Sequence, residues 1–169
     1  MYVRRRTSNG SKEELAYVNL LTGMRGDFML QEEEMTLAAK HTAGNTILVV
    51  EDDPDTQLLF TTTFSLLTPY HVQVARNDIE AFHFVKHIKP SLFILDYRLP
   101  RMNGIDLYDQ LHATLGLERI PAILISSVSS EEVTREIESR KLIHKEKPFD
   151  LDDLLLTIAD VLSWQRENA

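Results

Sequence analysis

The sequence predicts an α/β protein in which a parallel sheet of five strands carries helices on both faces. Five short apolar runs alternate with five segments of helical periodicity. Several of these runs are apolar throughout, which is typical of strands that are covered on both faces. Strands that alternate with helices favour parallel pairing and right-handed crossovers. These observations together indicate the fold class.

The composition is that of an ordinary globular protein and excludes several classes. The 169 residues are 43% hydrophobic and 26% charged and include no cysteine, so disulfides and thiolate metal sites are excluded. No apolar run approaches the roughly 18 residues of a membrane-spanning helix. The net charge of −8 disfavours binding of nucleic acid or an anionic membrane over the whole surface. We therefore expect no nucleic-acid or membrane partner and, since cysteine is absent, a cytoplasmic location.

A change in composition near residue 45 divides the chain into two predicted parts. Residues 1–44 hold six basic and six acidic residues and show little periodicity apart from two weak helical stretches. We predict a weakly structured extension there, or translation from upstream of a natural start at Met29 or Met35. A segment that docks on a partner is the alternative. Residues 45–169 hold 12 basic and 20 acidic residues, and we predict one domain there.

The first half of this domain shows three strands and two helices, in alternation. Strands are expected at residues 47–50, 71–75 and 92–95, and helices at 54–67 and 78–87. The order Asp53-Pro54 is typical of an N-cap followed by the first turn of a helix. Pro69 and Pro90 follow the two helices, because proline cannot continue a helix.

The second half continues the alternation with three helices and two strands. Helices are expected at 105–115, 129–140 and 151–165, and strands at 122–125 and 142–146. Asn103 and Gly104 precede the first of these helices, where a turn is needed. The second helix is highly charged, with a thin apolar stripe, and the last helix is strongly amphipathic.

Polar side chains follow four of the predicted strands. The carboxyl ends of parallel strands form the edge at which ligands bind in such folds. Asp96, Ser126 and Lys147 follow the third, fourth and fifth strands, and three acidic residues follow the first: Glu51, Asp52 and Asp53. Crowded carboxylates repel one another unless cations balance them, and Mg²⁺ prefers such oxygen ligands. With Lys147 as a second positive charge, the edge suits a phosphoryl group, and Asp96 offers a carboxylate nucleophile.

Four motifs at these strand ends resemble the receiver domain of bacterial two-component response regulators. They are VVEDDP at 49–54, ILDYRLPRMNG at 94–104, ILISS at 123–127 and KPF at 147–149. The resemblance covers roughly residues 45–166. It implies a flavodoxin-like, three-layer α/β/α sandwich with strand order 2-1-3-4-5.

The resemblance also implies how this site works. Asp96 would accept a phosphoryl group from the phosphohistidine of a histidine kinase or phosphotransfer protein. Lys147 would contact a phosphoryl oxygen, and Pro148 would follow a cis peptide bond. Ser126 would bind the phosphoryl group and report its presence.

A divalent metal ion, Mg²⁺ or Mn²⁺, is implied at the same place. The resemblance makes Asp52 the principal acidic ligand, with Glu51 beside it. Asp96 and the backbone carbonyl of Arg98 would complete the protein's contacts with the ion.

His144 departs from the pattern of the resembling family. That family usually has tyrosine or phenylalanine three residues before the lysine, and this ring moves inward when the hydroxyl residue engages phosphate. His144 is therefore either a switch residue that works with Ser126 or an exposed residue on an edge strand.

These implications predict a single-domain response regulator, because the chain ends at Ala169, directly after the last helix. We expect a phosphoacceptor rather than an enzyme, with only self-catalysed phosphorylation and dephosphorylation. It would be a monomer or weak homodimer with an unknown downstream partner. One alternative is a receiver-like binding module that does not respond to phosphorylation. A remote alternative is a phosphatase that uses Asp53 and Asp55, although Pro54 indicates that these residues begin a helix.

Overall fold

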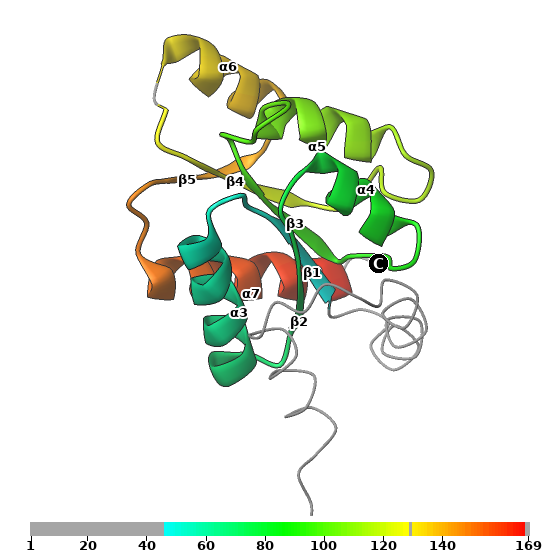
Figure 1. Cartoon of the computed structure of the whole chain (residues 1–169), viewed down its shortest axis with the longest axis vertical. Coiled ribbons are helices and arrows are strands. Elements are labelled where there is room, and N and C mark those ends of the chain that lie inside the picture. The colour runs from blue at the N-terminus through cyan, green and yellow to red at the C-terminus, as the bar shows by residue number, and fades with distance from the viewer. Residues whose placement is uncertain (1–45, 129, 168–169) are drawn as a thin grey trace, which may run out of the picture. The chain divides into compact units, whose positions relative to one another are not determined.

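Five strands and five helices alternate along the described part of the chain, as predicted (Figure 1). The structure is a computed structural model that describes residues 46–128 and 130–167, so the weak helical stretches predicted within residues 1–44 lie outside it. The elements are β1 (Thr46–Val50), α3 (Pro54–Leu67), β2 (His71–Ala75), α4 (Asp78–Val85), β3 (Leu92–Asp96), α5 (Gly104–His112), β4 (Ala122–Ser126), α6 (Glu131–Ser139), β5 (Ile143–Glu146) and α7 (Leu151–Glu167).

The strands form one parallel sheet in the order β2-β1-β3-β4-β5, which confirms the order implied by the resemblance. Val50 pairs with Ala75 on one side and with Leu95 on the other, so the carboxyl ends of three strands are in register. Further along the sheet, Ser126 pairs with Glu146. The residues that follow the strands therefore meet at one edge.

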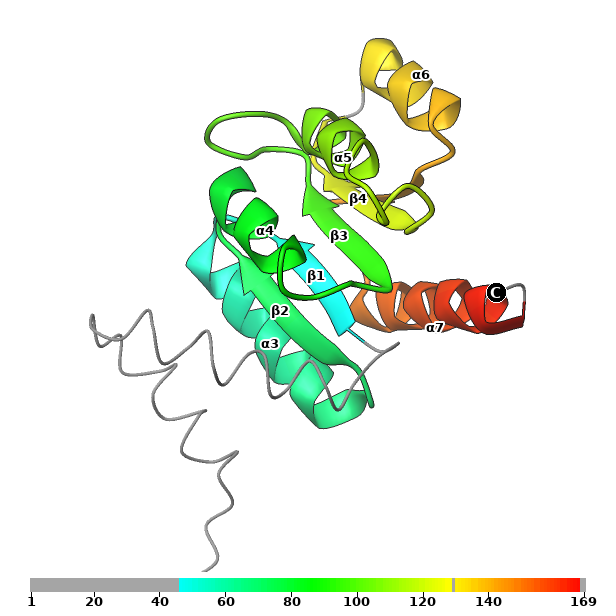
Figure 2. The ribbon, with the colours of Figure 1, turned by 90° about the vertical axis from the view of Figure 1, so that its right-hand side faces the viewer.

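Helices cover both faces of the sheet and make three layers. Helices α3 and α7 lie on one face, and α4, α5 and α6 lie on the other (Figures 1 and 2). Alternate residues of β1 point to opposite faces: Ile47 belongs to the core cluster that includes residues of α3 and α7, and Leu48 to the cluster that includes residues of α4, α5 and α6. This two-sided burial explains why the strands are apolar throughout.

Side-chain caps fix the starts of four helices. The side chains of Asp53, Asn77, Asn103 and Ser130 each accept a hydrogen bond from a backbone N–H in the first turn of the helix that follows. Because Ser130 is a cap, α6 begins at Glu131, two residues later than the sequence predicted.

Four helices end at different residues than predicted, and one of them, α6, ends at Ser139, one residue early. Helix α4 ends at Val85, two residues early, because the N–H of Lys86 bonds to the carbonyl of His83 in a tighter turn. Helix α5 ends at His112, three residues early, and the chain then turns through Gly116, whose φ is 89°. Helix α7 extends to Glu167, two residues beyond the predicted end.

Within residues 46–128 and 130–167, no helix combines the length and the apolar character that a membrane span requires.

Candidate functional site

Lys147 joins two carboxylates at the carboxyl edge of the sheet. Its Nζ lies 2.9 Å from Oε2 of Glu51 and 3.0 Å from Oδ2 of Asp96. Glu51 directly follows β1, Asp96 ends β3, and Lys147 directly follows β5. Such charge-assisted hydrogen bonds are among the stronger polar contacts in proteins. The sheet thus brings together three side chains that are far apart in the sequence.

Burial makes the electrostatics of this group unusual. Glu51 is 2% exposed and Asp96 7% exposed. Burial raises the pKa of Glu51, and the nearby charge of Asp96 adds to the rise, although the hydrogen bond from Lys147 opposes it. Burial also acts to lower the pKa of Lys147, but its hydrogen bonds to the two carboxylates outweigh this effect, so that its pKa is raised. Lys147 therefore stays charged at neutral pH. A further cation at the site would stabilise the ionised form of Glu51.

Asp52 completes an acidic cluster beside Lys147. One carboxylate oxygen from each of Glu51, Asp52 and Asp96 lies within 4.8 Å of the others, and Asp52 is exposed while the other two are buried. Three hard oxygen donors with an open, solvent-facing side fit Mg²⁺ or Mn²⁺, which keep several water ligands. One ammonium beside three carboxylates leaves negative charge that such an ion would balance.

Backbone and side-chain contacts fix Glu51 in place. Its N–H donates to the carbonyl of Ala75 at 3.0 Å, and its own carbonyl accepts from Nε2 of Gln57 at 2.6 Å. The N–H of Asp53 donates to Oε1 of Glu51 at 3.2 Å. Gln57 was not among the residues predicted from the sequence. Its position one turn into α3, above the end of β1, is the signal that would have identified it.

A tight loop follows Asp96 and leads into α5. The N–H of Arg98 donates to Oδ1 of Asp96 at 3.3 Å, and Arg98 also pairs with Asn103 across the base of the loop. The N–H of Gly104 donates to the carbonyl of Tyr97 at 2.9 Å. A Cβ atom on Gly104 would lie 2.4 Å from the carbonyl oxygen of Asp96, so this close approach requires glycine. The loop thus holds Arg98, whose carbonyl is a predicted metal ligand, two residues after Asp96.

Ser126 reaches the same edge, but its hydroxyl is bound to its own turn. The side chain is fully buried. Its Oγ accepts from the N–H of Val128 at 2.8 Å and donates to the carbonyl of Val128 at 3.2 Å. The backbone of Lys147 is tied to this strand, since its N–H donates to the carbonyl of Ser126 at 2.8 Å. The peptide bond between Lys147 and Pro148 is cis, as the resemblance implied.

His144 lies on β5 opposite Leu124 and is partly exposed. Its Nε2 atom is nevertheless buried and has no hydrogen-bond partner among residues 46–128 and 130–167. On the same strand, Lys145 forms an ion pair with Asp153 of α7. The residue as a whole is partly exposed on this edge strand, so the interpretation as an exposed edge residue stays a prediction. The switch role of His144 stays a prediction.

Asp53 is an N-cap, as the sequence indicated. Its Oδ1 accepts from both the N–H and the hydroxyl of Thr56 at 2.8 Å, and these hydrogen bonds lower its pKa. Asp55 is an exposed residue in the first turn of α3. The geometry of the two residues is that of a helix start, which gives no support to a phosphatase that uses them.

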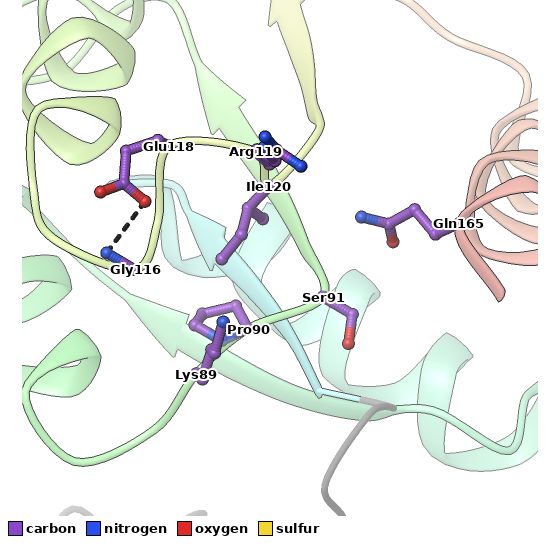
Figure 3. A pocket seen from close by; sticks show the side chains of 8 residues that line it. All are labelled: Lys89, Pro90, Ser91, Gly116, Glu118, Arg119, Ile120 and Gln165. Carbon is purple, nitrogen blue, oxygen red and sulfur yellow. Dashed lines mark hydrogen bonds between the residues drawn. The ribbon is translucent and has the colours of Figure 1, made fainter. Parts of the chain in front are cut away.

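The structure has a cavity of about 760 Å³, and Figure 3 shows the residues that line it. The cavity is lined by residues that come just before β3 and β4, such as Ser91 and Ile120. It therefore lies at the amino edge of the sheet, opposite the carboxyl edge that holds the acidic cluster. Its lining comprises Lys89, Pro90, Ser91, Gly116, Glu118, Arg119, Ile120 and Gln165. None of these residues belongs to the predicted site at the carboxyl edge.

Comparison with known proteins identifies the family. The sequence profile of the response regulator receiver domain matches residues 47–159. Regulatory protein AtoC of Escherichia coli strain K12 is 32% identical over 127 residues, which are 73% of this chain and 26% of AtoC. Sporulation initiation phosphotransferase F of Bacillus subtilis strain 168 is 28% identical over 109 residues, which are 64% of this chain and 86% of that protein.

Solved structures show the same fold. A CheY-like response regulator receiver domain protein from Methanospirillum hungatei JF-1 superposes with a TM-score of 0.64 at 24% identity. The superposition covers 74% of this chain and 98% of the other. Since the profile spans most of the chain, the protein belongs to the response regulator receiver domain family.

Proposed function

We propose that this chain is a phosphoacceptor switch in two-component signalling, with Asp96 as the residue that is phosphorylated. Receiver domains are signalling domains that bind Mg²⁺ at an acidic cluster and interact with histidine kinases or phosphotransfer proteins. The observation that carries the proposal is the bridge from Lys147 to Glu51 and Asp96 beside the carboxylate of Asp52.

The proposed reaction moves a phosphoryl group from nitrogen to oxygen. A carboxylate oxygen of Asp96 attacks phosphorus, and the bond between phosphorus and the donor imidazole nitrogen breaks. The imidazole leaves with that electron pair and takes up a proton, and Asp96 becomes an acyl phosphate. Asp96 is 7% exposed, so the open side of the cluster at Asp52 is the side from which a donor approaches.

The cations at the site oppose the charge of the phosphoryl group. Lys147 holds its ammonium 3.0 Å from Asp96, where it offsets negative charge on the transferring oxygens. Glu51, Asp52, Asp96 and the carbonyl of Arg98 would hold Mg²⁺. When bound, this ion supplies a second positive charge at the same oxygens.

Ser126 is the proposed reporter of phosphorylation. It lies at the end of β4, next to β3, and its hydroxyl is bound to Val128 in this structure. An acyl phosphate on Asp96 offers a charged acceptor, which forms stronger hydrogen bonds than a carbonyl does. We infer that the hydroxyl turns toward the phosphoryl group, with His144 as the proposed partner in this switch.

The proposal also covers the domain content, the oligomeric state, the location and the phosphate donor of the protein. The chain spans about a quarter of the length of AtoC but most of sporulation initiation phosphotransferase F. We propose a single-domain regulator, a monomer or weak homodimer in the cytoplasm, that passes on phosphate or binds a partner when phosphorylated. Phosphate would come from a histidine kinase or a phosphotransfer protein.

Acetyl phosphate with Mg²⁺ tests the proposal without a cognate kinase. We expect intact-mass spectrometry to show one added phosphate, which a chelator prevents and peptide mapping assigns to Asp96. The Asp96→Asn variant should gain none. The matched control is Asp53→Asn, which changes a cap 2.8 Å from the N–H of Thr56 and should still accept phosphate. Modification of Asp96→Asn at the parental rate would refute the assignment.

The alternative of a receiver-like binding module is tested by beryllofluoride, which mimics a phosphoryl group. We expect amide resonances of residues 129–147 to shift when it binds. Binding without any shift in this segment would favour the alternative.

A further inference from the structure

Asp78 is a buried carboxylate outside the acidic cluster. It is the first residue of α4, and its side chain is 8% exposed. A buried carboxylate is costly unless a cation or hydrogen bonds compensate it. Asn77 already caps the helix by accepting from the N–H of Glu80 at 3.0 Å. The charge of Asp78 therefore needs another explanation.

Its ion-pair partner among the described residues is Arg101. Nε of Arg101 lies 3.6 Å from Oδ1 of Asp78, and the arginine side chain is 58% exposed. Arg101 belongs to the loop between β3 and α5, which starts directly after Asp96. The pair thus connects the start of α4 to the loop beside the proposed phosphorylation site.

The rest of this loop is fixed mainly at its base. Arg98 pairs with Asn103, and Gly104 donates to Tyr97. Arg101 lies between these paired positions, where the contact with Asp78 ties the turn of the loop to a helix on the same face of the sheet. Leu99 and Met102 add apolar packing against the core. The ion pair therefore adds a polar contact between the turn and α4.

We propose that Asp78 and Arg101 are positioning residues that hold the loop after β3 so that the carbonyl of Arg98 faces the metal. This inference rests on the proposed function. Favourable interaction of Asp78 with the N-terminus of α4 is the structural alternative. That alternative predicts an effect on stability and none on metal affinity.

The test compares Mg²⁺ affinity, measured by calorimetry, among variants of the full chain. For Asp78→Asn and Arg101→Gln, we expect the dissociation constant to rise about three- to tenfold, less than the roughly 10–100-fold typical of residues that touch a metal ligand directly. The double variant should match either single variant, because both remove one contact. Arg101→Lys should restore most of the affinity.

The matched control is Glu80→Gln. Glu80 lies on the same helix and pairs at 3.0 Å with Arg76, whose side chain is 70% exposed. We expect its Mg²⁺ affinity to stay within about twofold of the parent. Urea unfolding without Mg²⁺ is measured for every variant, so that loss of stability is separated from loss of affinity.

The outcomes distinguish this inference from the proposed function. A parent that neither binds Mg²⁺ nor accepts phosphate would contradict the proposed function itself. A normal parent whose Asp78→Asn and Arg101→Gln variants both bind Mg²⁺ equally well would overturn the inference, even if both unfold more easily. Additive effects in the double variant would also overturn it. Should Asp78→Asn fail to fold, the exposed Arg101→Gln decides.

Discussion

At the scale of single residues, the positive charge of Lys147 offsets the repulsion between the carboxylates of Glu51 and Asp96. Glu51 and Asp96 are buried together, and the ammonium lies within 3.0 Å of both. The sequence predicted that these three residues share one edge. It did not predict that Glu51 is buried and Asp52 exposed, because spacing along a strand gives the position of a residue and not the direction in which its side chain leaves the loop.

Replacing Lys147 tests this balance. In Lys147→Met, two buried carboxylates lose their shared cation. Without Mg²⁺, the free energy of unfolding at pH 7 should fall by about 1–3 kcal/mol, somewhat less than for a fully buried pair. The control is Lys145→Met, whose partner Asp153 has a side chain that is 60% exposed, and we expect a loss below about 1 kcal/mol. Equal losses in urea unfolding would contradict this view.

Gly104 offers a second test at a single residue. In Gly104→Ala, the new Cβ would lie 2.4 Å from the carbonyl oxygen of Asp96 and 2.8 Å from Cδ1 of Leu124. The start of α5 must shift, which should cost about 1–3 kcal/mol and weaken Mg²⁺ binding. The control Gly116→Ala has open space but a φ of 89°, so it should cost about 1 kcal/mol and leave Mg²⁺ affinity unchanged. Unchanged Mg²⁺ affinity in Gly104→Ala would show that the loop tolerates the shift.

At the scale of elements, one ion pair ties α5 to α6. Arg140, just after α6, donates to both carboxylate oxygens of Asp109 on α5, at 2.8 and 2.7 Å. The hydrogen bonds from Arg140 lower the pKa of Asp109 and those same bonds raise the pKa of Arg140, so both shifts favour the charged pair. Sequence patterns gave no sign of this contact, because it joins residues from different helices.

The pair predicts a pH dependence. Since the pKa of Asp109 is lower in the folded state, its contribution is complete above the usual value of 3.8 and is lost as the pH falls through the lowered pKa. Arg140→Met should therefore reduce the free energy of unfolding by about 0.5–1 kcal/mol at pH 7, a modest value because Asp109 is partly exposed. The loss should vanish in strong acid. The control is Arg135→Met, whose pair with Glu131 is exposed, and little change is expected at any pH.

Helix α3 shows where element-level prediction is limited. Its bounds were predicted correctly at 54–67, since Asp53-Pro54 and Pro69 mark both ends. The face of α3 that is buried was not predicted, because apolar residues occur on all sides of the helix. Phe60, Thr63 and Phe64 are buried. Four leucines are at least 43% exposed: Leu58, Leu59, Leu66 and Leu67.

At the scale of the whole molecule, alternation of strands and helices was enough to predict the layers of the fold. It did not fix the strand order β2-β1-β3-β4-β5, which depended on the resemblance carried by the motifs. Neither the alternation nor the motifs predicted the hydrogen bonds of Ser126 or the contact between Asp78 and Arg101. They depend on side-chain rotamers that neither periodicity nor motif encodes.

The proposed domain boundary gives a whole-molecule prediction. All the residues of the site lie within residues 46–167, so a shortened chain that begins at Asn45 should keep the site intact. We expect its Mg²⁺ dissociation constant to stay within about twofold of the full chain and its rate of modification by acetyl phosphate to be similar. A shortened chain that fails to fold would show that residues 1–44 are part of the domain.

The turn from Ser126 to Val128 has a consequence for how a signal would leave the proposed phosphorylation site. The buried hydroxyl both donates to and accepts from the backbone of Val128. If the acyl phosphate recruits that hydroxyl, one amide and one carbonyl lose their partner at the same moment, and buried backbone groups must find others. The signal would then begin as a loss of backbone hydrogen bonds in the segment that leads to α6, before any helix has moved.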